Sequence, residues 1–350
     1  MDRGFVWRDA GRTVVFGPGA LARVPSLLDR HGVSEFALLS TERALGEEAG
    51  AALARDASAV HIVGPGPVPP LAAALLERIL EESDGSRHFP RGPGRSLVAF
   101  GGGRVVDVAK AVASVSGADV VAIPTTMSGA EMTAIHRLPA GAEQRVRGTV
   151  RPRLVIADPE QMTAQPEAAL RASSMNALAH GADSLYTPLA NPLAEHAAGR
   201  GAELIGTALD QAPAERDRSG LALGSVLCGY AIDSAGFGLH HVVCQTLVRV
   251  CGTPHAETNA AILPVALGFL ATRAPAALEP VAAALGVGLA GLPARVAELG
   301  RPAALEPLAS APEELERALE AMLERSELDR VPGPSVSRAD LAGIVAAAWQ

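Results

Sequence analysis

The feature that most constrains this fold is an apolar strand pattern that runs through three glycines into a helical pattern. The strand pattern covers residues 96–100, the glycines are Gly101, Gly102 and Gly103, and the helical pattern covers residues 105–116. A strand, a glycine turn and a helix N-terminus offer backbone N–H groups and a positive dipole end to an anion. Glycine lets the backbone approach a phosphate closely because it has no side chain. The stretch therefore predicts an anion-binding turn.

The helix after the glycines carries the only lysine of the chain, Lys110; all the other members of its 30 Lys and Arg residues are arginines. Asp107 lies three residues before Lys110, so the two are neighbours on a helix and can pair. A compact ammonium group differs chemically from a planar guanidinium. We take Arg104, Asp107 and Lys110, with the glycines, as candidate cofactor-binding residues. The alternative is a surface ion pair beside a capping glycine.

Residues 12–160 alternate between strand and helical patterns. Strand patterns lie at 13–16, 35–39, 59–63, 96–100, 119–123 and 154–157. Helical patterns lie at 21–31, 43–55, 70–82 and 105–116, and a polar Gly/Pro-rich segment at 84–95 predicts a loop. This alternation predicts an α/β domain with a mostly parallel sheet covered on both faces. Ligands bind such sheets at the carboxyl ends of the strands.

A second candidate cofactor loop follows the strand pattern at 119–123. It contains Thr125, Thr126 and Ser128, whose hydroxyls can bind phosphate or ribose; a polar turn with hydroxyl-to-backbone bonds is the alternative. Ser40 follows another strand and has no charge to repel a 2′-phosphate, which favours tolerance of NADPH, whereas the nearby Glu42 would favour NADH. A Rossmann G-x-G-x-x-G motif is absent.

After residue 158 the strand patterns nearly vanish and Ala/Leu-rich segments follow. We expect these segments to be helices, the clearest at 312–328 and 338–349, with breaks at Pro188, Pro192, Pro213, Pro254 and Pro264. The predicted organisation is an α/β nucleotide-binding domain at 1–160 and an all-α catalytic domain at 161–350.

Histidines gather on three segments of the predicted helical domain. Asn176 and His180 are four residues apart, as are His241 and Gln245, and His255 follows a proline at a predicted helix start. A divalent metal would suit the three histidines better if Asn176 were a carboxylate. Histidines can also donate protons during a reduction. Each one taken singly is more commonly a core or surface residue.

Composition limits the classes of partner. An apolar fraction of 48% suffices for a large core, and a net charge of −8 without basic runs argues against nucleic acid. Three cysteines without a CxxC motif suit a reduced compartment. No signal-peptide core or membrane-length apolar run is present. We expect a cytoplasmic protein that binds a small molecule and no membrane.

Several motifs together resemble one family, the iron-containing (group III) alcohol dehydrogenases. They are Gly-Gly-Gly-Arg-Val-Val-Asp-Val-Ala-Lys at 101–110, Ile-Pro-Thr-Thr-Met-Ser-Gly-Ala-Glu-Met-Thr at 123–133 and Pro-His-Ala-Glu-Thr-Asn-Ala-Ala-Ile-Leu-Pro at 254–264. Met-Asn-Ala-Leu-Ala-His at 175–180 and Leu-His-His-Val-Val-Cys at 239–244 look most like the maleylacetate reductases of that group. The resemblance is collinear from about residue 12 to residue 268.

The resemblance implies a dehydroquinate synthase-like fold with an active site between the two domains, an NADH or NADPH cofactor and a homodimer. It implies that Gly101, Gly102, Gly103 and Asp107 form the first cofactor loop and that Thr125, Thr126 and Ser128 form the second. His180, His241 and His255 match the three metal-site histidines of the family. Asn176 stands where the alcohol dehydrogenases have a metal-binding aspartate. Maleylacetate reductases tend to have Asn there and are regarded as metal-independent.

The chain departs from the family pattern at several positions. Arg104 replaces a serine after the glycines, Met127 replaces a tyrosine, Ala130 replaces a serine, and Gln245 replaces a histidine. A C-terminal Asn-Pro-Arg-Pro-like stretch is replaced by Val-Pro-Gly-Pro-Ser-Val at 331–336.

Three functional hypotheses follow. The first is an NAD(P)H-dependent, metal-independent reductase of a small carbonyl or enone, with His241 and His255 as proton donors and His180 and Asn176 as substrate-binding groups. The second is a metal-dependent alcohol dehydrogenase, with His180, His241 and His255 as ligands and Asn176 tolerated beside them. The third is a repurposed non-redox member, such as a dehydratase, isomerase or cyclase in a biosynthetic pathway.

Overall fold

The computed structural model describes residues 5–9, 11–82, 96–301 and 312–348. The chain divides into two compact units, Met1–Ala164 and Gln165–Gln350. The loop predicted at 84–95 and the last residue of the helix predicted at 338–349 lie outside the described residues.

The described part of the first unit contains a seven-stranded sheet in the order β1-β2-β7-β6-β5-β3-β4. The strands are β1 (Phe5–Asp9), β2 (Arg12–Phe16), β3 (Phe36–Ser40), β4 (Ala59–Ile62), β5 (Ser96–Gly101), β6 (Asp119–Pro124) and β7 (Leu154–Ala157). Strands β2 to β7 pair in parallel, and β1 pairs antiparallel with β2 at one edge. The mostly parallel sheet predicted from the alternating patterns is therefore confirmed.

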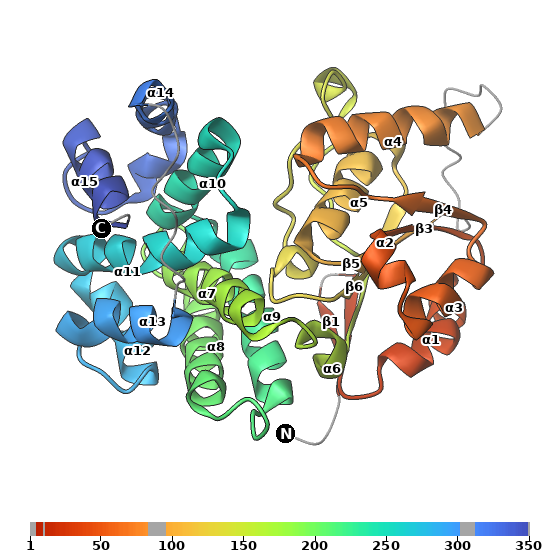
Figure 1. Cartoon of the computed structure of the whole chain (residues 1–350), viewed down its shortest axis with the longest axis horizontal. Helices are drawn as coiled ribbons and strands as arrows, with labels where there is room; N and C mark the ends of the chain where they lie inside the picture. The colour runs from red at the N-terminus through yellow and green to blue at the C-terminus, as the bar shows by residue number, and fades with distance from the viewer. Residues whose placement is uncertain (1–4, 10, 83–95, 302–311, 349–350) are drawn as a thin grey trace. The chain divides into compact units, whose positions relative to one another are not determined.

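Helices cover both faces of this sheet. They are η1 (Leu21–Arg23), α1 (Val24–Arg30), α2 (Glu42–Leu45), α3 (Glu48–Asp56), α4 (Val68–Glu82), α5 (Gly103–Ser116), η2 (Ala130–Met132), η3 (Glu143–Arg145) and α6 (Pro159–Met162). Helices α4 and α5 lie over one face, and α1 and α3 lie over the other (Figure 1). Each face buries its own cluster, around Val106 and Val112 on one side and around Leu27 and Phe100 on the other. Burial of these aliphatic side chains stabilises both layers.

The strand order reverses between β3 and β5. From β3 the chain proceeds outward to the edge strand β4, whereas from β5 it proceeds the other way to β6. In open α/β sheets, ligands bind beside the carboxyl ends of the two strands that flank such a reversal. Ser40 and Gly101 are the last residues of these two strands, so the first candidate cofactor loop lies at the reversal.

The second unit is helical in its described part. Its helices are α7 (Glu167–Asp183), α8 (Pro192–Asp210), α9 (Arg218–Ala235), α10 (Leu239–Cys251), α11 (His255–Arg273), α12 (Pro275–Ala284), η4 (Leu289–Gly291), α13 (Leu292–Gly300), α14 (Pro312–Leu323), η5 (Ser326–Arg330) and α15 (Arg338–Ala348). Every residue of α7 from Leu170 to Asp183 is buried, which places this helix at the centre of the unit. The α/β-plus-helical fold class is thus confirmed.

Four details differ from the sequence-based expectation. The helix predicted at 43–55 is two helices, because α2 ends at Leu45 and α3 starts again after Glu47. The break predicted at Pro264 is wrong, since α11 continues through it; the flanking apolar residues are buried and hold the helix despite the missing N–H. Strand β1 was not predicted. The helix predicted at 312–328 ends at Leu323.

No single described helix is long and apolar enough to cross a membrane; two sharply bent pairs, α9 with α10 and η4–α13 with α12, would meet that test by length and composition.

Candidate functional site

The glycine turn after β5 packs directly against the second candidate loop. Helix α5 begins at Gly103, and its N-cap residue, Gly102, supplies no side-chain cap. A β-carbon at Gly102 would stand 3.0 Å from the Thr126 methyl, and one at Gly103 would stand 2.8 Å from both Cβ and Oγ of Ser128. Glycine is therefore required here for close approach of the two loops. The uncapped helix start and its dipole suit the pyrophosphate of a dinucleotide.

Lys110 ties helix α5 to the segment after the second loop. Its ammonium lies 2.8 Å from the Asp107 carboxylate and donates to the carbonyl oxygens of Ala130, Thr133 and Ile135 at 2.9, 3.2 and 2.7 Å. The side chain is fully buried. Within this unit Lys110 holds the loop in place, and the partly exposed carboxylate of Asp107 is the member of the pair that meets solvent.

The remaining cofactor candidates of the first unit occupy different environments. Ser40 is fully buried and donates from Oγ to the Phe100 carbonyl at 2.7 Å, which joins β3 to β5 at the reversal of strand order. Thr125 is buried, and its N–H donates to the Gly101 carbonyl at 3.0 Å. Arg104 is exposed on the first turn of α5, where its charge adds to the positive helix end.

Glu131 is a buried carboxyl group that the sequence analysis did not single out. Neither of its carboxyl oxygens is hydrogen-bonded to another described residue. Burial raises its pKa from 4.5 to about 7, while its own backbone N–H and the nearby Lys110 ammonium act in the opposite direction. The segment directly after the second candidate loop therefore contains an acid whose pKa is raised toward neutral pH.

In the second unit, three histidines form a histidine cluster: His180 on α7 with His240 and His241 on α10. The rings of His180 and His241 are stacked with centroids 4.8 Å apart and planes 19° apart, and His240 meets His241 edge-on at 5.0 Å. Among the described residues, Nδ1 of His180 and Nε2 of His241 have no hydrogen-bond partner although both are buried. Nδ1 of His240 is likewise buried without a partner among these residues, so each ring of the cluster has one open nitrogen.

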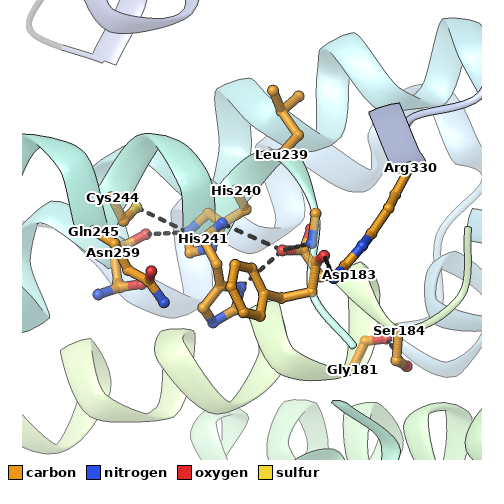
Figure 2. Close-up of polar contacts among 12 residues, drawn as sticks. Gly181, Asp183, Ser184, Leu239, His240, His241, Cys244, Gln245, Asn259 and Arg330 are labelled. Atoms are coloured by element: carbon orange, nitrogen blue, oxygen red, sulfur yellow. Dashed lines mark hydrogen bonds and ion pairs between the residues drawn. The ribbon is translucent and has the colours of Figure 1, made fainter. Parts of the chain in front are cut away.

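Asp183 and Tyr186 hold this cluster from α7 and the turn after it. Oδ2 of Asp183 accepts from Nδ1 of His241 at 2.7 Å, and Figure 2 shows the carboxylate facing that ring. The same oxygen accepts from the backbone N–H groups of Gly238 and His241 at 3.1 and 3.2 Å. The Tyr186 hydroxyl donates to Oδ1 of Asp183. The carboxylate thus caps α10, whose own N-cap residue provides no side chain.

The cluster combines neutral rings with a charged carboxylate. Burial, followed by the neighbouring His241 and His240, lowers the pKa of His180 well below its ordinary value, and burial lowers that of His240 to about 3. Burial alone would raise the pKa of Asp183, but the hydrogen bond from His241 and the nearby imidazoles hold it far below its ordinary value. At neutral pH the cluster therefore contains neutral His180 and His240 rings beside one ionised carboxylate.

The other candidates lie around this cluster. Asn176 is buried one turn before His180 on α7. His255 is the first residue of α11 and is exposed, and it is close enough to contribute to the lowered pKa values of His180 and His240. The Gln245 side chain accepts from Arg325 at 3.4 Å. The structure thus stacks His180 on His241, whereas His255 is linked to the cluster by its contribution to these lowered pKa values.

Asp183 was missed by the sequence analysis because its partners on α10, Gly238 and His241, lie more than fifty residues further along the chain. A local signal was nevertheless present. Asp183 is three residues after His180, which places both on one helix face, and it is the only acidic residue between 168 and 186. An acidic residue on the same helix face as His180 could therefore have been considered as a partner for another histidine of the site.

The donor groups present fit a divalent metal poorly. The set Asn176, His180, His241 and His255 contains no carboxylate to offset the charge of the ion. Asp183, His240 and His241 do place one ligand atom each within 4.8 Å of one another. However, both Asp183 oxygens already accept hydrogen bonds, one of them from Nδ1 of His241.

Comparison with known proteins identifies the family. Residues 11–159 match the model described as iron-containing alcohol dehydrogenase, and residues 171–320 match that of the Fe-containing alcohol dehydrogenase family, C-terminal. Maleylacetate reductase 1 of Rhodococcus opacus is 30% identical over 99% of this chain and 96% of its own length. Maleylacetate reductase of Burkholderia cepacia is 34% identical over 83% of this chain and 85% of its own.

A solved structure agrees with these relatives. The crystal structure of maleylacetate reductase from Rhizobium sp. strain MTP-10005 matches with a TM-score of 0.79 and 29% identity, over 100% of this chain and 99% of that one. The chain belongs to the iron-containing alcohol dehydrogenase family and is similar to its maleylacetate reductases. It is therefore an oxidoreductase, of a family that uses NAD(P)H.

Proposed function

We propose that the chain reduces a small carbonyl or enone substrate with NADH or NADPH and without a metal ion. The observation that carries the proposal is the open Nε2 of His241 beside the stacked His180 ring, with Asn176 in place of a carboxylate ligand. The names of the relatives make maleylacetate, a keto dicarboxylate, the first substrate to test.

Four side chains take part in the proposed reaction, two as proton donors and two as substrate-binding groups. Nicotinamide, when bound, supplies a hydride to an electron-poor carbon of the substrate. His241 delivers from Nε2 the proton that the resulting oxyanion or enolate takes up, which gives an alcohol or a saturated ketone. His255 is the second proposed proton donor. His180, kept neutral by burial, and Asn176 hold the substrate by hydrogen bonds.

Two arginines lie near the histidine cluster, and their positive charge favours a substrate that carries a carboxylate. The ring of Phe237 lies 5.9 Å from that of His241, and the guanidinium carbons of Arg325 and Arg330 lie 5.8 and 5.7 Å from the Phe237 ring centroid. Glu327 pairs with Arg325. Arg330 donates to the Phe237 carbonyl at 2.9 Å. Arg330 is therefore the guanidinium that we assign to the substrate anion.

The first experiment measures cofactor binding and then turnover. Purified protein is titrated with NADH and with NADPH by nicotinamide fluorescence, and oxidation of each is followed with maleylacetate and with a neutral aldehyde. The proposal expects saturable binding and faster oxidation with maleylacetate. Absence of binding by both cofactors contradicts it and favours a non-redox reaction in the same fold.

The second experiment tests the proton donor with His241→Asn. The Asn side-chain amide retains a donor toward Asp183 but lacks the Nε2 nitrogen, so folding and cofactor affinity should persist. We expect kcat to fall by about 10²- to 10⁴-fold, the usual contribution of a positioned general acid. Full turnover by this variant would remove His241 from the mechanism.

A metal-dependent dehydrogenase is the second candidate, supported by the proximity of Asp183, His240 and His241. The two candidates differ in what chelation does. Protein purified with a chelator, and shown to be metal-free by elemental analysis, should retain full turnover under the first proposal. Lost turnover that returns with Fe²⁺ or Zn²⁺ would favour the metal-dependent candidate.

A further inference from the structure

We propose that Asp183 is a positioning residue that fixes His241 with its hydrogen on Nδ1, so that Nε2 is the nitrogen presented to the substrate. This inference rests on the proposed role of His241 as proton donor and adds a residue to it.

The geometry admits one assignment of the hydrogen. An ionised carboxylate is only an acceptor, and Oδ2 of Asp183 already accepts from two backbone N–H groups, those of Gly238 and His241. At 2.7 Å from this oxygen, Nδ1 of His241 must be the donor. In the neutral ring, Nε2 then carries the lone pair, and in the charged ring it carries the proton that can be delivered.

The second carboxylate oxygen keeps Asp183 from rotating away. Oδ1 accepts from the Tyr186 hydroxyl, and the Tyr186 oxygen in turn accepts from the N–H of Leu239 at 2.7 Å. Five groups donate to Asp183 directly or through Tyr186, and all except the Tyr186 hydroxyl belong to the start of α10, at Gly238, Leu239 and His241. The His241 ring and the first turn of its helix are consequently held as one unit by a single buried carboxylate, which is 1% exposed.

The neighbouring histidines lack this support. Nε2 of His240 donates to the Asn259 carbonyl at 3.2 Å, and its Nδ1 has no partner among the described residues. Nδ1 of His180 likewise has none. Within the histidine cluster, His241 is the ring that a carboxylate contacts, so an imidazolium formed there is stabilised by an opposite charge.

The test compares Asp183→Asn, Asp183→Glu and a matched control, Asp217→Asn. Asp217 also caps a helix: its Oδ1 accepts from the N–H of Gly220 at 2.8 Å at the start of α9. Four quantities are measured: kcat and KM with the best substrate, the NAD(P)H dissociation constant, and the ¹⁵N shifts of His241, which report the nitrogen that carries hydrogen.

We expect hydrogen on Nδ1 of His241 in the unaltered protein. Asp183→Asn keeps an acceptor but removes the charge, so kcat should fall by about 10²-fold or more with KM and cofactor affinity nearly unchanged. Asp183→Glu should recover part of the loss, and Asp217→Asn should leave kcat unaltered.

Hydrogen on Nε2 in the unaltered protein, or full kcat in folded Asp183→Asn, overturns the inference. If Asp183→Asn does not fold, the ¹⁵N measurement on the unaltered protein still decides it. Failure of the proposed function has a different signature: the unaltered protein would neither bind nor oxidise NAD(P)H, whatever the His241 tautomer.

Discussion

The backbone of Gly238 lies directly against the hydroxyl of Tyr186, and a β-carbon at position 238 would overlap that oxygen and its ring. This contact joins the N-cap of α10 to the residue that holds Asp183. The start of α10, the Asp183 carboxylate and the His241 ring are therefore coupled through a position that tolerates no side chain.

Gly238→Ala tests this coupling. Overpacking in a buried site costs about 1–3 kcal/mol, and Tyr186 can relieve it only by releasing Asp183. We expect a lower free energy of unfolding in urea together with a roughly tenfold to hundredfold lower kcat, because small misplacements of reacting groups have effects of that size. Gly199→Ala is the matched control, since its β-carbon would meet no atom within 4 Å. A normal kcat in Gly238→Ala would show that Asp183 does not depend on Tyr186.

The parts of the fold predicted from the sequence are those with local signals. The strand, the glycine turn and helix α5 are contiguous, and each has a clear period or turn residue, so their order and place in a parallel sheet followed directly. The exceptions are also local. Thr41 fixes the start of α2 by accepting from the Ala44 N–H at 3.2 Å, and the Gly46 N–H closes its end on the Glu42 and Arg43 carbonyls, which makes a separate short helix where one longer helical pattern was expected.

The parts of the site that escaped prediction depend on contacts distant in sequence. Burial of Glu131, the Asp183–His241 bond and the contacts of Lys110 with the segment after the second loop all depend on the folded structure. Lys110 was singled out as the only lysine, but its burial among carbonyl oxygens 20 to 25 residues away could not be inferred from spacing. Propensity and periodicity assign elements, whereas partner choice depends on tertiary packing.

The contact between Gly103 and Ser128 leads to a prediction about the cofactor. In Gly103→Ala the new methyl would stand 2.8 Å from Cβ and Oγ of Ser128, so the second loop must move away from the helix start. We expect NADH and NADPH to bind about tenfold more weakly or worse, measured by fluorescence titration. Ser128→Gly removes both clashing atoms, so the double variant should be more stable than Gly103→Ala, with a coupling of about 0.5–3 kcal/mol. Simple additivity of the two changes would argue against the contact.

Lys110→Met should destabilise the first unit strongly. The substitution leaves three buried carbonyl oxygens and Asp107 without their cation, and breaking a buried pair costs about 3–5 kcal/mol. Hydrogen exchange should show faster exchange of the backbone amides from 130 to 135. Asp107→Asn is the comparison: its side chain is partly exposed, so the loss should be nearer about 1 kcal/mol. Equal losses would contradict the assignment of Lys110 as the anchor of this loop.

The pKa of Glu131 predicts how stability depends on pH. Burial raises it from 4.5 to about 7, so between these values the unfolded chain releases a proton that the folded chain retains. The free energy of unfolding should therefore fall as pH rises from 4.5 to about 7 and then level off. At about 1.4 kcal/mol for each pH unit, the total change is on the order of 3 kcal/mol.

Glu131→Gln separates this contribution from every other titrating group. The amide has nearly the same shape and no charge, so its stability advantage over the unaltered protein should grow with pH across that window and stay constant above it. Urea unfolding of both proteins at several pH values measures the difference directly. Glu167, whose pKa is lowered to about 2 mainly by its hydrogen bond to Arg216, titrates below the window and is present in both proteins. The expected slope arises only if the Glu131 carboxyl stays protonated in the folded state while the unfolded chain ionises. A difference in free energy of unfolding that does not change with pH would therefore show that Glu131 is ionised in the folded state.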